Sequence, residues 1–478
     1  MRRRLDCSLS PPRAQYRPIG GISHDALSAM RPTLLLLLAS LATPTRTVAQ
    51  PSVAFVDVTV IPMDRERVLE RHTVVVQDGR ISAMGPTATT RPPAGAIVVD
   101  GKGKYLIPGL GDAHAHLSTQ GGGQALAERA VQLYALNGVT MARSMYTEPH
   151  HSAVRDRVDR NELTGPRLVL VSPPIGGQNA ATPDAVRAAV IAHRAAGYTI
   201  LKVMPGLTRS TFDTLVAAAR GAGVTLVGHV PSDVGLAGVL AAGFTSIEHL
   251  DGFIEALVPA PVSAGQSGFF GFGALAAVDE ARIATLVSEV KASGTTVVPT
   301  EFEMELFTST QGGTELAKRA EMRYVPAPLV AGWTQQKDGS ARALGVTPER
   351  GARFRELRRR LIRELNAAGV PIAAGSDAFN MFDVAGFGMF AELEVLAESG
   401  LTPYQALASG TVRVAHLTGL DTIAGSIGVG RSADLVLLDA DPLGDIRNVR
   451  RQAGVMLRGQ WLSRQAIAAR LTALAASP

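Results

Sequence analysis

Short apolar runs alternate with helical stretches through most of this 478-residue chain. From position 110 onward, eight runs rich in β-branched and small apolar residues are separated by segments with the spacing of amphipathic helices. Eight strand–helix units in series, over about 300 residues, predict an α/β fold, the closed (β/α)8 TIM barrel. The strands are expected at 111–116, 139–144, 167–172, 199–203, 225–229, 245–249, 296–300 and 371–376.

Local signals indicate where several of the intervening helices begin. Thr182 followed by Pro183 has the form of an N-cap with proline at the first helical position. Thr402 and Gln405, with a proline between them, have the form of a capping box. A third helix has an apolar face with the spacing i, i+3, i+4, i+7, formed by Phe212, Leu215, Val216 and Ala219.

The two ends of the chain carry a different pattern, made of short strands separated by turn residues. We expect both ends to form one small β-sandwich domain, 50–108 together with 425–478, and the barrel of residues 109–424 to be inserted into it. The strands predicted for this domain are 53–60, 72–77, 96–100, 433–439, 454–458 and 461–462.

Residues 1–49 have the pattern of an export leader. Met30-Arg31 precedes a leucine-rich stretch, 34–42, that is too short to span a membrane, and small residues follow up to Ala49. We expect a signal peptide with its true start at Met30, and a mature protein that is periplasmic or secreted. The alternative is a disordered cytosolic tail. No later stretch of the sequence is apolar enough to span a membrane.

The composition indicates that the chain beyond the leader is close to neutral. The formal charge is +5, but residues 1–49 hold seven arginines and two acids, which leaves 40 basic and 40 acidic residues. Such a balance does not indicate a nucleic-acid or anionic-membrane partner. The only cysteine, Cys7, lies in the leader, so disulfides and thiolate metal sites are excluded from the mature protein.

Candidate chemistry lies at the ends of the predicted strands. His114 and His116 are two apart on the first strand, so both imidazoles can face the barrel interior and reach one metal ion. Asp112 shares that face, where it either braces the histidines or ties down the strand. His229 and His249 end the fifth and sixth strands, which places two more imidazoles side by side. Neutral imidazoles suit Zn, Fe, Co or Ni.

A lysine and an aspartate complete this set. Lys202 falls within an apolar run on the fourth strand, where its charge is costly to bury. It either pairs with a carboxylate or has an amine that serves as a metal-bridging ligand. Asp377 closes the eighth strand, where a carboxylate can bind a metal and accept a proton from metal-bound water.

The other histidines lack such a pattern. One of them shares a helical face with apolar residues, and the others have no partner at a recognisable spacing. We expect packing or surface positions for His24, His72, His150, His151, His193 and His416.

Two long segments follow the sixth and seventh strands, on the face where barrel active sites form. Residues 259–273 are rich in glycine, and residues 307–350 form a long insertion. Each is either a lid over the site or an ordinary surface insertion.

Taken together, these residues resemble the metal-dependent amidohydrolase superfamily. Residues 108–116 look like its opening PGxxDxHxH signature, and Lys202, His229, His249 and Asp377 match its later ligand positions in order. Residues 428–436 resemble its return to the small β-domain. The similarity covers about residues 52–465, and the closest branch is the imidazolonepropionase-like one, which includes Xaa-Pro dipeptidases.

This resemblance implies a binuclear metal centre. His114, His116 and Asp377 would hold one ion, and His229 and His249 would hold the other. Lys202, carboxylated by CO2, would bridge both. Two divalent ions are implied, zinc foremost, with manganese, cobalt and iron as other candidates. The same lysine argues against imidazolonepropionase itself, whose relatives use a mononuclear site without it.

The implied function is an exported hydrolase that cleaves an amide bond in a small molecule, such as a dipeptide or an N-acyl amino acid. A metal-bridging hydroxide would attack the carbonyl carbon, and Asp377 would shuttle the proton to the leaving nitrogen. Arg143, at the end of the second strand, either holds a substrate carboxylate or forms a structural salt bridge. The alternatives are hydrolysis of a lactone, a cyclic imide or an organophosphate ester and, more remotely, an inactive binding barrel. The sequence leaves both a monomer and a homo-oligomer as alternatives.

Overall fold

The computed structural model describes residues 50–118, 122–259 and 264–476. The predicted leader, 1–49, lies outside these ranges. Within them, no helix is both long and apolar enough to cross a membrane.

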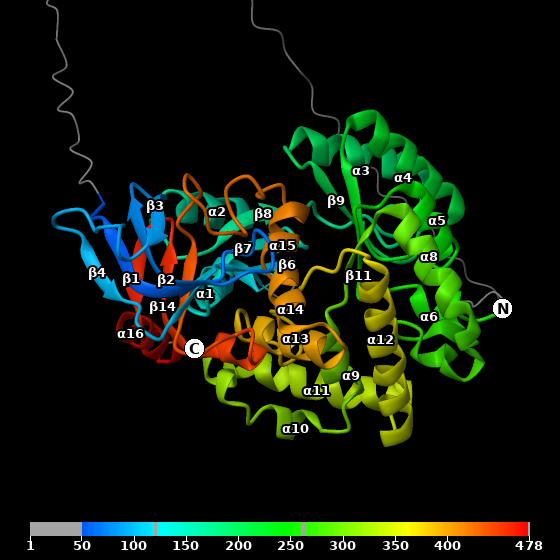
Figure 1. Ribbon diagram of the computed structural model, residues 1–478. Coiled ribbons are helices and arrows are strands. Elements are labelled where there is room, and N and C mark those ends of the chain that lie inside the picture. The colour runs from blue at the N-terminus through cyan, green and yellow to red at the C-terminus, as the bar shows by residue number, and fades with distance from the viewer. Residues whose placement is uncertain (1–49, 119–121, 260–263, 477–478) are drawn as a thin grey trace, which may run out of the picture. The chain divides into compact units, whose positions relative to one another are not determined.

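Strands from both ends of the chain form one eight-stranded sheet (Figure 1). They are β1 (Val53–Val60), β2 (Leu69–Gln77), β3 (Arg80–Pro86), β4 (Ile97–Asp100), β5 (Tyr105–Pro108), β13 (Leu435–Leu438), β14 (Gln452–Leu457) and β15 (Gln460–Ser463). The order is β15-β14-β13-β5-β1-β2-β3, with β4 paired to β1. The two ends of the chain meet where β13 pairs antiparallel with β5, as the sequence analysis predicted, although β3 and β5 themselves were not predicted.

Seven of the eight strands predicted for the middle of the chain are present, in two parallel sheets. One sheet is β6 (Leu110–Ala115), β7 (Val139–Ser144) and β8 (Arg167–Leu170), and the other is β9 (Ile200–Val203), β10 (Thr225–Gly228), β11 (Ser246–Glu248) and β12 (Thr296–Val298). The eighth predicted strand, 371–376, is represented by a single bridge between Ile372 and Val297. This part of the chain is therefore a mixed α/β fold with parallel sheets.

Backbone hydrogen bonds connect the two parallel sheets on both sides. On one side, the Ser172 amide donates to the Ile200 carbonyl at 3.0 Å, so the segment that follows β8 lies beside the start of β9. On the other side, the Ala373 amide donates to Val297 and the Ala113 amide donates to Ala374, at 3.0 and 2.9 Å. Residues 371–377 thus lie between β12 and β6.

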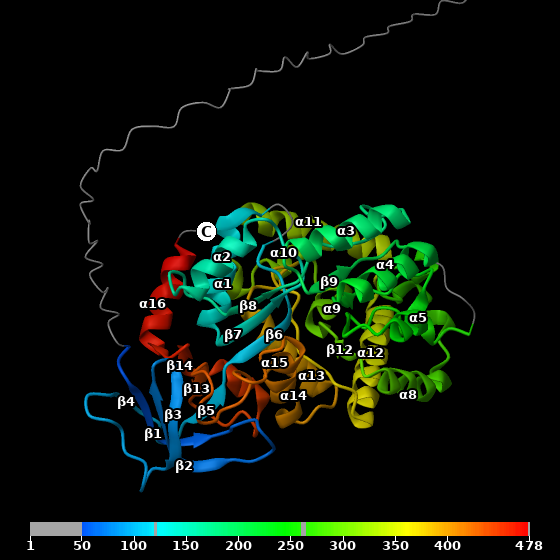
Figure 2. The same ribbon diagram turned by 90° about the horizontal axis from the view of Figure 1, so that it is seen from above.

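Helices follow the strands and lie outside them (Figure 2). Those between successive parallel strands are α1 (Gly123–Leu136), α2 (His151–Asp159), α3 (Pro183–Ala195), α4 (Arg209–Ala222), α5 (Gly235–Ala242), α6 (Phe253–Ala256), α7 (Ala264–Ser267) and α8 (Ile283–Ser293). After β12 come α9 (Glu301–Thr308), α10 (Gly313–Leu316), α11 (Ala327–Leu344), α12 (Pro348–Ala368), α13 (Phe387–Glu398), α14 (Pro403–Ser409), α15 (Val412–Leu417) and α16 (Arg464–Ala475).

The predicted helix caps are present in the structure. The Thr182 hydroxyl accepts a hydrogen bond from the Ala185 amide at the start of α3. Thr402 and Gln405 form a complete capping box at the start of α14. Helix α4 ends at Gly223, whose φ of 64° is a conformation that glycine adopts without strain.

Asp112 ties the first parallel strand to the segment that follows the bridge at Ile372. Its fully buried carboxylate accepts hydrogen bonds from the backbone amides of His114, at 3.0 Å, and Ser376, at 3.1 Å, and from the Ser376 hydroxyl. Two roles were considered for Asp112, bracing the histidines and tying down the strand. The structure shows the second role, because the hydrogen bonds that the carboxylate accepts come from the backbone and the Ser376 hydroxyl.

We expect Asp112→Ala to lower the free energy of unfolding by about 2–4 kcal/mol, because it leaves buried donors without an acceptor. Asp112→Asn keeps one acceptor oxygen and should cost clearly less. Urea denaturation followed by far-ultraviolet circular dichroism measures both. Equal losses for the two variants would contradict the tethering role.

Candidate metal centre

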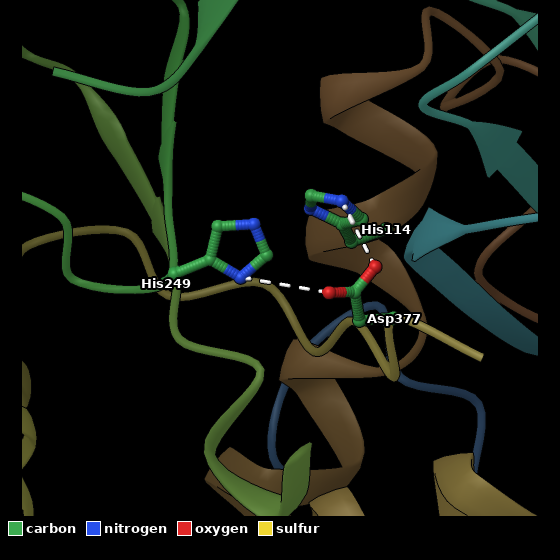
Figure 3. Close-up of side chains that lie close together, drawn as sticks. All are labelled: His114, His249 and Asp377. Atoms are coloured by element: carbon green, nitrogen blue, oxygen red, sulfur yellow. Dashed lines mark ion pairs between the residues drawn. The ribbon is translucent and has the colours of Figure 1, made fainter. Parts of the chain in front are cut away.

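Side chains from distant parts of the sequence meet at the carboxyl ends of the parallel strands. His114 lies on β6, His249 directly follows β11, and Asp377 follows the bridge at Ile372. Their ligand atoms all lie within 4.8 Å of one another. The Asp377 carboxylate lies between the two imidazoles, 3.3 Å from His114 Nε2 and 3.8 Å from His249 Nδ1 (Figure 3).

The other predicted residues border this group. His116 Nε2 is 2.7 Å from Asp377 Oδ1. The ring of His229 stacks on that of His249, with centroids 4.9 Å apart. Lys202 is 3% exposed, and its charge acts on the pKa values of both His114 and His249. The structure therefore gathers the six predicted residues around one region, although they span more than half of the chain.

Three partners orient the imidazoles, and the sequence analysis assigned none of them this role. His114 Nδ1 lies 2.9 Å from Glu248 Oε2, and His229 Nδ1 lies 3.1 Å from Asp251 Oδ2. An acceptor at Nδ1 fixes the ring and leaves Nε2 available to a ligand. His249 Nδ1 lies 2.8 Å from the Thr300 hydroxyl. The only available signal was that Glu248 and Asp251 flank His249 in the sequence.

Arg143 forms the salt bridge that was one of its two predicted roles. Its guanidinium is fully buried and donates to Glu248 Oε1 at 3.0 Å, to the Ser246 hydroxyl at 3.0 Å and to the Ala113 carbonyl. Contact of Arg143 with a substrate carboxylate, the other role considered, stays a prediction. The physical role of Arg143 in the structure is to support Glu248, which in turn orients His114.

Burial and neighbouring charges set the protonation states of the cluster. Burial, aided by the charge of Lys202, lowers the pKa of His114 to about 4, and burial also lowers the pKa of His249 well below its usual value. The pKa of the Lys202 amine is also lowered by burial. Burial acts to raise the pKa of Asp377, but its interactions with His114, Glu303 and His116 together outweigh burial and hold that pKa well below the usual range. The cluster thus presents neutral imidazoles around a carboxylate anion.

Glu303, on α9, is a further acid at the cluster that sequence reasoning missed. It is 2% exposed, and it accepts a hydrogen bond from the side-chain amide of Asn380. Burial and the charge of Asp377 raise the pKa of Glu303 well above its usual value. A raised pKa for Glu303 and a lowered pKa for Asp377 favour a proton on Glu303 and a negative charge on Asp377. No spacing rule links position 303 to the strand ends.

The donor set fits divalent cations. Asp377 Oδ1 is buried and lies 2.7 Å from His116 Nε2 and 3.3 Å from His114 Nε2, so a carboxylate and two imidazoles converge where they could share a cation. No carboxylate in the described part of the chain forms a salt bridge with the Lys202 amine, so the carboxylate pairing considered for it is absent there. Neutral imidazoles, a carboxylate and an amine without a salt-bridge partner are a ligand set that zinc and related ions accept.

Aromatic side chains cover one side of the cluster. The Phe270 ring lies 5.9 Å from the His229 centroid, nearly parallel to it, and 5.0 Å from the His249 centroid. Phe270 belongs to the predicted lid segment 259–273, part of which lies outside the described residues. Lid movement in this segment stays a prediction.

A second group of potential ligands lies nearby, among residues for which the sequence analysis expected no role. Glu148, His150 and His151 place their ligand atoms within 4.8 Å of one another. The Ser118 hydroxyl donates to Glu148 Oε2 at 3.1 Å and contacts His151 Nε2 at 3.2 Å. These contacts secure the loops that follow β6 and β7.

We expect Glu248→Gln to reduce stability at neutral pH, with a difference from wild type that shrinks in acid. Burial acts to raise the pKa of Glu248, but Arg143 and His114 outweigh it and lower that pKa from 4.5 to about 2. A lowered carboxyl pKa contributes stability above pH 4.5 that is lost as the pH falls through about 2. Melting temperatures between pH 7 and 2.5 test this, with the exposed Glu289→Gln as control. A pH-independent difference between Glu248→Gln and wild type would contradict the assignment.

Comparison with known proteins shows a family match for the sequence and similar folds among solved structures. The model of the amidohydrolase family matches residues 105–462. Adenine deaminase of Ruegeria pomeroyi is 28% identical over 235 residues, which cover 45% of this chain and 38% of the deaminase, so the match spans less than half of that protein. The bottromycin amidohydrolase structure superposes with a TM-score of 0.68 at 23% identity, covering 89% of this chain and 90% of its own. A Xaa-Pro dipeptidase with bound methionine in its active site gives a TM-score of 0.62 at 20% identity, covering 86% and 100%.

Proposed function

Because the chain belongs to the amidohydrolase family, we propose that it is a metal-dependent hydrolase that cleaves a carbon–nitrogen amide bond in a small molecule. The observation that carries the proposal is the convergence of His114, His116 and His249 on the buried Asp377 carboxylate. Such a donor set at strand ends is the ordinary setting of a hydrolytic metal site.

The two parallel sheets and residues 371–377 are best explained as one (β/α)8 barrel. Hydrogen bonds lead from β6 through β7 and β8 to β9, and from β12 through Ala373 back to Ala113. The barrel would occupy 109–424, and 50–108 with 425–478 would form the small β-sandwich domain. The solved structures that share the fold support this arrangement.

In this proposal six residues hold two divalent ions. His114, His116 and Asp377 would bind one ion, His229 and His249 the other, and Lys202, carboxylated by CO2, would bridge them. The lowered pKa of Lys202 favours the neutral amine that reacts with CO2. When bound, two ions, zinc foremost with manganese, cobalt or iron as alternatives, supply Lewis acidity that activates water and polarises an amide carbonyl.

The protein groups orient the centre and move the proton. Glu248 and Asp251 hold the rings of His114 and His229. Asp377 is ionised and can accept the proton of the attacking water, then deliver it to the leaving nitrogen. Burial and the charge of Asp377 raise the pKa of Glu303 well above its usual value, so in this proposal Glu303 is the protonated neighbour of the ionised Asp377.

Amide hydrolysis is preferred over the other reactions such a centre supports. A lactone, a cyclic imide or an organophosphate ester would meet the same residues, and an inactive binding barrel would keep the same fold. The family match favours hydrolysis, and the two solved structures compared above are a dipeptidase and an amidohydrolase.

We expect Asp377→Asn to lower kcat about 10²–10⁴-fold, the range typical of a lost general acid–base, while the protein retains bound metal. Steady-state kinetics on amide substrates, together with metal analysis by mass spectrometry, test this. The exposed Asp233→Asn is the matched control and should leave both quantities unchanged. Full activity of Asp377→Asn would refute the proton-transfer role.

We further propose that the protein is exported to the periplasm or secreted. The support is the basic and leucine-rich pattern of residues 30–49 and the absence of cysteine after Cys7. Protein isolated from the native cells should begin near Gln50 when its N-terminus is sequenced. Recovery of a mature, cytosolic protein that begins at Met1 or Met30 would contradict export.

A further inference from the structure

A cavity of about 890 Å3 lies beside the cluster, with His116 at its inner end. This volume falls within the usual range for small-molecule sites. The loops after β6 to β9, helix α11 and the segment after Asp377 contribute its walls. The larger lining side chains are His116, Tyr146, Met204, Leu329, Trp333 and Phe379.

The described lining of this cavity contains no lysine, arginine, aspartate or glutamate. Two cations close in sequence to lining residues, Arg143 and Lys337, are occupied elsewhere, and a third, Lys202, lies two residues before Met204 and belongs to the metal cluster. The Arg143 guanidinium is buried against Glu248, and the Lys337 amine, four residues beyond Trp333, donates to the carbonyls of Phe307 and Ser309 at 2.8 and 2.7 Å. A carboxylate in the cavity would therefore lack a counter-ion from these walls.

The lining offers apolar and neutral polar contacts instead. Trp333, only 3% exposed, lies 5.7 Å from the Phe379 ring and 5.8 Å from the Phe382 ring, which together form an aromatic wall. The exposed amides of Gln178 and Gln336 provide neutral donors and acceptors. These surfaces match an uncharged, partly aromatic molecule.

Resting on the proposed hydrolase function, we infer that the substrate is an uncharged amide with an aromatic or bulky apolar group and no free carboxylate beside the scissile bond. This inference differs from the substrate class expected from the sequence, because a dipeptide and an N-acyl amino acid both carry that carboxylate. Desolvating a carboxylate against these uncharged walls costs free energy that no ion pair with the lining offsets.

A matched pair of compounds tests the inference. N-benzoylglycinamide and N-benzoylglycine differ in one charged group and share the same scissile amide. With the metal-loaded enzyme, we expect kcat/KM to be at least tenfold higher for the glycinamide. Equal or faster hydrolysis of N-benzoylglycine would overturn the inference and leave the proposed function intact. Absence of hydrolysis of both would count against the proposed function.

Binding can be measured separately from turnover. The chain has two tryptophans, so Trp461→Phe leaves Trp333 as the sole tryptophan reporter in the cavity wall. Quenching of its fluorescence should show at least tenfold tighter binding of the glycinamide. Equal binding of the two compounds, or no binding of either, would overturn the inference even if neither is hydrolysed.

A positive charge introduced at the cavity wall should invert the preference for N-benzoylglycinamide over N-benzoylglycine. Gln336→Arg places a cation in the lining, and we expect at least tenfold tighter binding of N-benzoylglycine. Gln335→Arg is the control, because Gln335 is an exposed neighbour on α11 outside the lining. An equal effect of the two substitutions would show that overall charge, and not the cavity wall, governs the preference, and would contradict the inference.

Discussion

The parallel alignment of β6 to β12 is the constraint on which the candidate site depends. Parallel strands end at the same edge, so residues that follow them in sequence are brought together in space. His114, His229 and His249 are neighbours for this reason alone. The Asp112 tether then fixes Asp377 against the first strand, because it holds the backbone of Ser376. If this alignment shifted by one residue, alternate side chains would face the cluster.

The buried charges around the cluster form a connected system. Arg143 supports Glu248, Glu248 orients His114, and His114 faces Asp377. A buried ion pair contributes little net stability, but removing one partner leaves an uncompensated charge. The arrangement is therefore explained by the positioning of an imidazole. The buried Asp377 carboxylate, which faces the imidazoles of His114, His116 and His249, is the group on which the proposed cation site centres.

Sequence patterns predicted the strands and helices and the candidate metal ligands at the strand ends, because both follow simple periodicities. Strand β7 has the predicted bounds, and His114 and His116, two residues apart, both approach the Asp377 carboxylate. The Arg143 side chain could not be placed from the sequence. Its position at a strand end suits a substrate contact as well as an internal ion pair, and only the neighbouring Glu248 and Ser246 reveal the ion pair.

Other parts of the site depend on tertiary contacts that leave no local signal. His249, Thr300 and Asp377 adopt φ values of 63°, 46° and 63°, which non-glycine residues rarely occupy and which no strand pattern predicts. Such strain, about 1–3 kcal/mol per residue, persists only where the surroundings enforce it. Glu303 reaches the cluster from α9 because that helix begins directly after Thr300. The uncharged cavity wall likewise combines loops that are remote in sequence.

The most direct test of the metal centre is a crystal structure of zinc-loaded protein, with diffraction data collected on both sides of the zinc absorption edge. Two anomalous peaks are predicted, one within bonding distance of His114, His116 and Asp377 and the other beside His229 and His249. Density for a carboxylated Lys202 should connect them. No anomalous peak at these residues, or an unmodified Lys202 turned away from them, would contradict the account.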